Sequence, residues 1–274
     1  MDAFELMKHI GYGGNGGAPI SIFITTASSV TFYVTGTNGT TLHIDWGNGD
    51  SEDVSMTGSE ITKTKNYGSG GTRNIKFSGD GNLALTVLKC DNNSLTYINV
   101  NTNINLTDFR CNDNSLITLR FNNASLQFLD CSNNLLTSLK LDNTPALYTL
   151  YCDNNSLITL DVTGITTLYE LYCNDNSLIS LTANYNPALV NVDCNTNSLT
   201  SFLPYNSPLL ALFICHTNNI NSTNINAQLY QLASNGINNG SYVGDSQSPS
   251  APPTGQGITD KATLESRGWT VTTD

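Results

Sequence analysis

A cysteine recurs at a nearly fixed interval through the middle of this chain. Successive cysteines lie 21, 20, 21, 21, 21 and 21 residues apart. They are Cys90, Cys111, Cys131, Cys152, Cys173, Cys194 and Cys215. Each has the same place in the pattern Leu-x-x-Leu-x-Cys-x-x-Asn-x-Leu-x-x-Leu, which is intact from Leu147 to Leu160 and from Leu168 to Leu181. A fixed period of this length predicts a solenoid, because each turn buries its apolar side chains against neighbouring turns.

An asparagine follows every one of these cysteines by three residues. The seven are Asn93, Asn114, Asn134, Asn155, Asn176, Asn197 and Asn218. The chain must turn off its strand at this point, and a buried side-chain amide can satisfy backbone groups of the neighbouring turn. We therefore expect a ladder of hydrogen-bonded amides inside the stack. In the seventh copy Thr223 replaces the last leucine, as expected where a terminal repeat gives way to a cap.

The repeat resembles the leucine-rich repeat, with cysteine in place of the last leucine of that family's Leu-x-x-Leu-x-Leu-x-x-Asn core. Seven copies occupy residues 82–225. The resemblance implies one parallel sheet on the concave side of the solenoid. Stacks of this kind usually bind other molecules and seldom catalyse reactions.

Three roles are open to the cysteines. An odd number of equivalent side chains in one line does not suit a disulfide framework. The short Cys-x-x-Cys or histidine spacings of a tetrahedral metal site are missing. The sequence therefore favours small buried hydrophobic side chains, and a row of reduced thiols suits folding in a reducing cytosol.

Residues 20–81 alternate apolar and polar side chains in short runs that end at turn residues. Examples are 20–24, 30–34, 42–46, 52–56 and 74–77. Runs of this length and spacing predict an antiparallel β-sandwich. The segment 45–50, which contains Trp46 and Gly47, and the later Lys65-Asn66-Tyr67 resemble the marks of a PKD-type immunoglobulin-like domain. Lys65 stands where that family commonly has histidine.

Three carboxylates lie in this region, at Asp45, Asp50 and Asp53. Their oxygens are of the kind that calcium prefers, but their spacing is unlike that of an EF-hand loop. The sequence favours a solvated turn over a calcium site. It predicts no metal site and no cofactor.

Residues 1–19 combine a short segment, with Phe4, Met7 and Ile10 near one face of a helix, and a glycine-rich tether. A helix this short is marginal in water. The alternatives are a docking arm that orders against a partner and a frayed terminus.

Residues 226–274 predict a short α/β cap for the last turn of the solenoid. Helices are expected at 226–233 and 259–268, and a strand at 269–271. The segment 262–269 resembles the end segments of leucine-rich-repeat proteins from Bacteroidota and their phages. Together these segments define a mainly β fold: an immunoglobulin-like sandwich, a leucine-rich-repeat solenoid and an α/β cap.

The formal net charge is −11, which argues against a nucleic-acid partner because phosphate binding needs a basic surface. No apolar run is long enough for a membrane-spanning helix. The acidic start of the chain lacks the features of a signal peptide. The three histidines, His9, His43 and His216, lie in different segments with no nucleophile motif nearby. We therefore expect a protein that is not an enzyme.

The binding surface is expected where strand residues point out from the sheet, three and one before each cysteine, and at the turn just after it. Near the middle of the stack these positions hold aromatic, carboxylate and amide side chains, which suit sugar rings or protein segments. The candidate ligand-binding residues are Phe128, Asp130, Tyr151, Tyr172, Glu170, Asp153, Asp175 and Asp193. The alternative is a solvated sheet face on which the tyrosines only pack along the strands.

Two settings follow for such a protein. The first is a bacteriophage virion, as a head or tail fibre or decoration protein that attaches to other virion proteins through residues 1–19. Its repeats would bind a host-surface polysaccharide or protein, with one or several copies on each particle. This setting accounts for the acidic start, the reduced cysteines and a surface in which charged residues make up only 12% of the chain. The second is a Bacteroidota cell-surface or secreted adhesin. A cytosolic scaffold fits the start of the chain but not so low a charge content, and we favour the virion.

Overall fold

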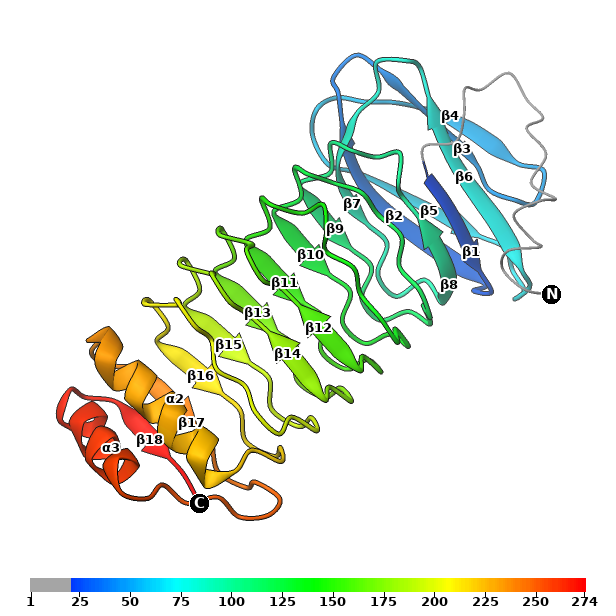
Figure 1. Ribbon diagram of the computed structural model, residues 1–274. Coiled ribbons are helices and arrows are strands. Elements are labelled where there is room, and N and C mark those ends of the chain that lie inside the picture. The colour runs from blue at the N-terminus through cyan, green and yellow to red at the C-terminus, as the bar shows by residue number, and fades with distance from the viewer. Residues whose placement is uncertain (1–20) are drawn as a thin grey trace.

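The protein is an elongated stack of β-structure, with an N-terminal β module, a solenoid and a C-terminal cap that carries two helices (Figure 1). The computed structural model describes residues 21–274. The predicted docking arm with Phe4, Met7 and Ile10 lies outside the described residues. Within them the mainly β character and the repeat solenoid are confirmed.

Six strands precede the repeats. They are β1 (Ser21–Thr25), β2 (Ser29–Gly36), β3 (Thr41–Asp45), β4 (Ser51–Ser55), β5 (Ile61–Asn66) and β6 (Arg73–Gly79). One antiparallel sheet has the order β4-β3-β6-β1-β8, in which β8 (Leu95–Asn99) belongs to the first repeat. In the second layer β2 pairs antiparallel with β5 and with β7 (Leu85–Lys89).

The two layers of the N-terminal module meet through aromatic rings. Alternation along β2 buries Val30, Phe32 and Val34. The ring centroid of Phe32 lies 4.8 Å from that of Phe23 on β1 and 5.1 Å from that of Phe77 on β6. One face of each layer therefore forms the core of the module, as a period of two residues along the strand requires.

The first repeat belongs to both the module and the solenoid. Strand β7 pairs antiparallel with β2 on one side and parallel with β9 (Asp108–Arg110) on the other. Strand β8 completes the five-stranded sheet by pairing with β1. The module therefore covers the end of the repeat stack, whose apolar interior would otherwise face water.

The repeats form a parallel sheet that continues from β5, β2 and β7. We call this eleven-stranded sheet the long sheet. Its further strands are β9, β10 (Phe128–Asp130), β11 (Thr149–Tyr151), β13 (Glu170–Tyr172), β15 (Asn191–Asp193), β16 (Leu212–Ile214), β17 (Ser241–Val243) and β18 (Thr270–Thr272). The central residues of neighbouring strands are in register and buried, as Leu129, Leu150 and Leu171 are. A second, two-stranded sheet joins β12 (Thr159–Asp161) and β14 (Ser180–Thr182).

The predicted asparagine ladder is confirmed. At Asn155, Nδ2 donates to the carbonyl of Cys131 in the preceding turn, at 3.0 Å, and to that of Cys152 in its own turn, at 3.2 Å. Its Oδ1 accepts a hydrogen bond from the N–H of Leu136 at 2.9 Å. The same contacts recur at Asn134, Asn176, Asn197 and Asn218. Each amide thus satisfies backbone groups of two successive turns.

All seven cysteines are buried and none forms a disulfide, as predicted. Burial raises the pKa of every thiol, and that of Cys215 to about 12. Their backbone N–H groups extend the strand pairing, as in the 2.9 Å bond from Cys152 to the carbonyl of Tyr172. The cysteines are therefore small core residues at the ends of the strands.

The cap contains both expected helices, α2 (Ser222–Asn235) and α3 (Gln256–Ser266). Helix α2 starts earlier than the predicted 226 because Asn221 caps it, with its side chain accepting a hydrogen bond from the N–H of Asn224 at 3.0 Å. Helix α3 likewise starts before the expected 259. Gly236, at the end of α2, has φ 76°, a left-handed conformation that favours glycine.

The cap also adds two strands to the solenoid, where the sequence predicted only one strand near the end. Strands β17 and β18 extend the long sheet in parallel. Gln247 takes the place of the ladder asparagine, since its Oε1 accepts from the N–H of Ile220 at 3.0 Å and its Nε2 donates to the carbonyl of Gly244 at 3.1 Å. The repeat pattern misses this turn because glycine and glutamine replace cysteine and asparagine.

Candidate binding face

The outward side chains of β10, β11, β13 and β15 form a continuous surface on the long sheet. We call this surface the sheet face. Because side chains alternate along a strand, the first and third residues of each point away from the buried central one. The sheet face comprises Phe128, Asp130, Thr149, Tyr151, Glu170, Tyr172, Asn191 and Asp193.

A row of aromatic rings crosses the sheet face. The centroids of Phe128 and Tyr151 lie 5.6 Å apart with an edge-to-face geometry, and those of Tyr151 and Tyr172 lie 4.9 Å apart. The guanidinium carbon of Arg110 lies 4.4 Å from the centroid of Phe128, so the row continues onto β9. The three rings are half-buried. The structure therefore brings the aromatic candidates together, with part of each ring open to solvent.

Carboxylates lie beside the rings. Glu170 accepts a hydrogen bond from the hydroxyl of Tyr151 at 3.4 Å and from Nδ2 of Asn191 at 3.0 Å. Asp130 Oδ1 accepts from the hydroxyl of Ser132 at 2.7 Å. These contacts hold the acids in fixed positions and leave further oxygen lone pairs for a ligand.

The other acidic candidates are distributed over the sheet face and its adjoining turns. Asp193 lies on β15 and accepts from the N–H and Nδ2 of Asn195 at 3.1 and 2.6 Å. Asp153 follows β11 and is half-buried. Asp175 is exposed at the turn after β13, where it accepts from Nδ2 of Asn174 at 2.8 Å. Asp175 is thus the candidate that lies farthest along its turn from the strand.

Burial is the main cause of the pKa shifts on this surface. It raises the pKa of the carboxyl groups of Asp130, Asp153 and Asp193. It also raises the pKa of the Tyr151 and Tyr172 hydroxyls, with a further contribution from the negative charge of Glu170. Within residues 21–274 the three aspartates form no ion pair. A ligand that supplies hydrogen-bond donors or positive charge would stabilise their ionised form.

A second pair of rings, absent from the sequence-based candidates, lies just before two of the strands that carry the sheet face. Tyr148 and Tyr169 directly precede β11 and β13, and their rings stack with centroids 5.0 Å apart and an interplanar angle of 5°. Tyr148 is exposed. Both lie four residues before a cysteine, the repeat position that Gln127 and Val190 occupy in neighbouring repeats. Aligning the repeats and comparing the residues at this position would have found the pair.

The structure also shows a cleft that the sequence did not predict. It has a volume of about 350 Å³ and lies where the N-terminal module meets the first three repeats. Tyr33 on β2 and Glu60 before β5 line it from the module. The repeats contribute Lys89, Asp91, Arg110 and Asp130. No repeat-based comparison could have found it, because Tyr33 and Glu60, two of its seven lining residues, come from outside the repeats.

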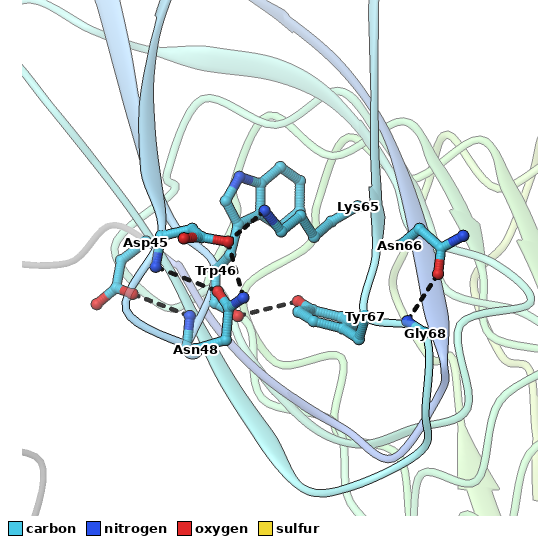
Figure 2. Close-up of polar contacts among 9 residues, drawn as sticks. Asp45, Trp46, Asn48, Lys65, Asn66, Tyr67 and Gly68 are labelled. Atoms are coloured by element: carbon cyan, nitrogen blue, oxygen red, sulfur yellow. Dashed lines mark hydrogen bonds and ion pairs between the residues drawn. The ribbon is translucent and has the colours of Figure 1, made fainter.

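The carboxylates considered for calcium are engaged by other groups of the protein. Asp50 binds Nζ of Lys65 at 2.6 Å, and Asp53 binds Nδ1 of His43 at 2.6 Å. Asp45 accepts a hydrogen bond from the N–H of Gly47 at 2.9 Å (Figure 2). In the part of the chain that the structure describes, no group of three or more histidine, cysteine, aspartate or glutamate side chains is placed to hold a metal ion.

Over residues 21–274, neither helix has the length and apolar character that crossing a bilayer requires.

Comparison with known proteins finds a likeness among solved structures. No protein-family model matches the sequence, and a search of curated proteins finds no match. Among solved structures, one described as "Functional domain of InlJ from Listeria monocytogenes includes a cysteine ladder" is 29% identical in sequence, with a TM-score of 0.43. The likeness covers 54% of this chain and 38% of that one, so it spans well under half of the InlJ chain.

Proposed function

We propose that this is a non-enzymatic binding protein, which uses the sheet face to bind a polysaccharide or protein on a host cell surface. The observation that carries the proposal is the row of half-exposed rings at Phe128, Tyr151 and Tyr172, flanked by fixed carboxylates. Aromatic faces with a few well-placed polar groups are typical of sites that bind sugars or protein segments.

The scaffold beneath the rings supports this function because it is rigid. The strands that carry the rings are paired on both sides. The amides of Asn155 and Asn176 fix the turns that follow β11 and β13. A surface that is already ordered loses little conformational entropy when it binds, which favours affinity.

The arrangement of nucleophiles and bases favours binding over catalysis. The thiols are buried with raised pKa values, so they are poor nucleophiles. His43 pairs with Asp53 at the surface, and Nδ1 of His216 lies 2.9 Å from the Thr217 hydroxyl. The first contact contains no hydroxyl or thiol nucleophile, and within residues 21–274 no third side chain hydrogen-bonds the His216 ring to orient it as a base.

For the N-terminal module we propose a PKD-type immunoglobulin-like domain. The two segments that resemble the family's marks meet in space, since the hydroxyl of Tyr67 donates to the carbonyl of Trp46 at 2.9 Å (Figure 2). Such a domain would hold the repeat stack at a distance from the structure that carries it.

The setting that we propose is a bacteriophage virion, with attachment through residues 1–19. Seven buried, unpaired thiols suit a protein that folds in a reducing cytosol. The alternative is a bacterial cell-surface adhesin. Proteomics of purified phage particles separates them: the proposal expects the protein in the particles at a fixed copy number, and its absence from them would favour the adhesin.

Binding itself is tested with purified protein and host cells. The double variant Tyr151→Ala/Tyr172→Ala should lose most of its cell binding, about tenfold or more in affinity, because the central rings of the row are removed. Tyr230→Ala, which removes an exposed ring on α2, is the matched control and should bind like the wild type. Equal binding by all three proteins would contradict the proposal.

A further inference from the structure

The cleft between the N-terminal module and the first three repeats lies at one end of the sheet face. Asp130 belongs to both, and the Arg110 guanidinium rests on the Phe128 ring, which begins the aromatic row. The module contributes Glu60 and Tyr33, and Tyr33 lies beside Lys89 in the long sheet. The aromatic row therefore leads at this end into a polar cleft.

The two cations of the cleft already have carboxylate partners. Nζ of Lys89 lies 2.6 Å from Oε2 of Glu60. Nε and Nη2 of Arg110 donate to the two carboxylate oxygens of Asp108 at 2.9 and 3.0 Å. A bidentate pair of this kind uses the donor pair of the guanidinium that is best placed for a carboxylate. The charge of each cation is therefore already balanced by a carboxylate, which weakens its attraction for an anionic ligand.

Two carboxylates of the cleft form no ion pair within residues 21–274, and the Arg110 charge that acts on both is held mainly by Asp108. The side chain of Asp91 makes no hydrogen bond or ion pair with any of residues 21–274, and it is half-buried. Asp130 accepts only from the neutral N–H and hydroxyl of Ser132, at 3.1 and 2.7 Å. The surplus of negative charge in a partly enclosed space favours a ligand group that is positively charged and donates hydrogen bonds.

The adjoining surface indicates what carries this positive charge. The backbone groups of β10 and β11 are paired on both sides, so an extended peptide cannot add to the sheet beside the cleft. The row of rings instead offers flat apolar faces, against which sugar rings can stack. The hydroxyls of a sugar would find acceptors at Glu170 and Asp193.

We propose that the cleft binds the ammonium group of an amino sugar near the end of a polysaccharide whose following sugar rings lie along Phe128, Tyr151 and Tyr172. This proposal rests on the proposed function of the sheet face. It adds the class of ligand and the direction in which the polysaccharide lies along the row of rings. The ammonium group donates to Asp91 and Asp130, at the end of the aromatic row that adjoins the N-terminal module.

The test is calorimetric titration of the full chain with two oligosaccharides that differ only at the amino group. The hexamer of β-1,4-linked glucosamine, protonated at the working pH, should bind about tenfold or more tightly than the hexamer of N-acetylglucosamine, because acetylation removes the charge. Hexalysine is titrated as a third ligand and should bind more weakly than the glucosamine hexamer.

Two isosteric variants assign the effect to the cleft. Asp91→Asn and Asp130→Asn should each reduce affinity for the glucosamine hexamer several-fold. Asp91→Asn, at a residue outside the sheet face, should leave affinity for the acetylated hexamer unchanged. Asp142→Asn, at an exposed turn of the third repeat, is the control and should change neither. Wild-type melting temperatures would show that the variants fold. The hexamer comparison, made on the wild-type chain, tests the proposal even if a variant does not fold.

Equal or tighter binding of the acetylated hexamer, absence of glucosamine binding, or tighter binding of hexalysine would each overturn the proposal. None of these results bears on the cell-binding test of the Tyr151 and Tyr172 variant. If that variant loses binding while the amino-sugar arms fail, the sheet face keeps its proposed function and only the ligand class is wrong.

Discussion

Nε2 of Gln247 donates to the carbonyl of Cys215 at 3.0 Å, across 32 residues of the chain. Asn218 makes the equivalent bond to Cys194 at 3.1 Å. The internal amide ladder therefore runs on into the cap. As a result, the cap continues the solenoid's backbone hydrogen bonding as well as covering its apolar end.

The first prediction concerns the ladder. Asn155→Ala leaves the backbone N–H of Leu136 without its side-chain acceptor and removes one of the two side-chain donors to the carbonyl of Cys131, which should cost about 1–3 kcal/mol of the free energy of unfolding. Asn122→Ala changes an exposed side chain in a repeat's variable half and should cost far less. Urea denaturation of both variants is the measurement, and equal losses would contradict the ladder's structural role.

The second prediction extends this to the cap. Gln247→Ala should destabilise the protein by about 1–3 kcal/mol as well, because it removes one acceptor and three donor contacts from buried backbone groups. Gln127→Ala, at an exposed position, serves as the control. If Gln247→Ala unfolds at the wild-type urea concentration, the cap does not continue the ladder.

The third prediction is a pH dependence. Burial raises the thiol pKa in the folded state, so above about pH 9 the unfolded chain releases protons that the folded chain retains. The free energy of unfolding should therefore be constant below this pH and fall above it, by about 1.4 kcal/mol per pH unit for each thiol. Urea denaturation between pH 8 and pH 10 would show it. Cys152→Ala should make the fall shallower, and an unchanged slope would mean that other groups cause it.

The fourth prediction concerns the N-terminal module. Tyr67→Phe removes the hydroxyl that binds the carbonyl of Trp46, and should cost about 1 kcal/mol. Burial raises the pKa of this hydroxyl to about 12, so it is a donor throughout the neutral range. Tyr33→Phe is the control and should have a smaller effect on the melting temperature. A larger effect for the control would show that the Tyr67 contact does not hold the two segments together.

Much of this fold follows from the sequence because its signals are local and periodic. Leu150, Cys152 and Asn155 recur with one spacing, so their burial and the ladder could be predicted. The turn of Gln247 could not be predicted. Glutamine is one methylene longer than asparagine, and this turn lies outside the 21-residue interval of the repeats, although its side chain makes the same bonds. The start of α2 was misplaced because its cap, Asn221, lies outside the repeat pattern.

The candidate site was predictable only in part. Phe128, Tyr151 and Tyr172 occupy outward positions that the repeat register defines, and the structure places them side by side. The cleft has no such register. Tyr33 reaches it through the antiparallel pairing of β2 with β7, and Glu60 through its ion pair with Lys89. Contacts between segments so distant in sequence depend on tertiary packing, which no spacing along the chain reveals.

The most direct test of the central claim is hydroxyl-radical footprinting of the full chain, alone and bound to polysaccharide purified from the host surface. The binding face proposed here predicts that Phe128, Tyr151 and Tyr172 become protected, while exposed Tyr185 and Tyr230 react as before. Unchanged labelling of the three rings, with protection elsewhere on the chain, would contradict it.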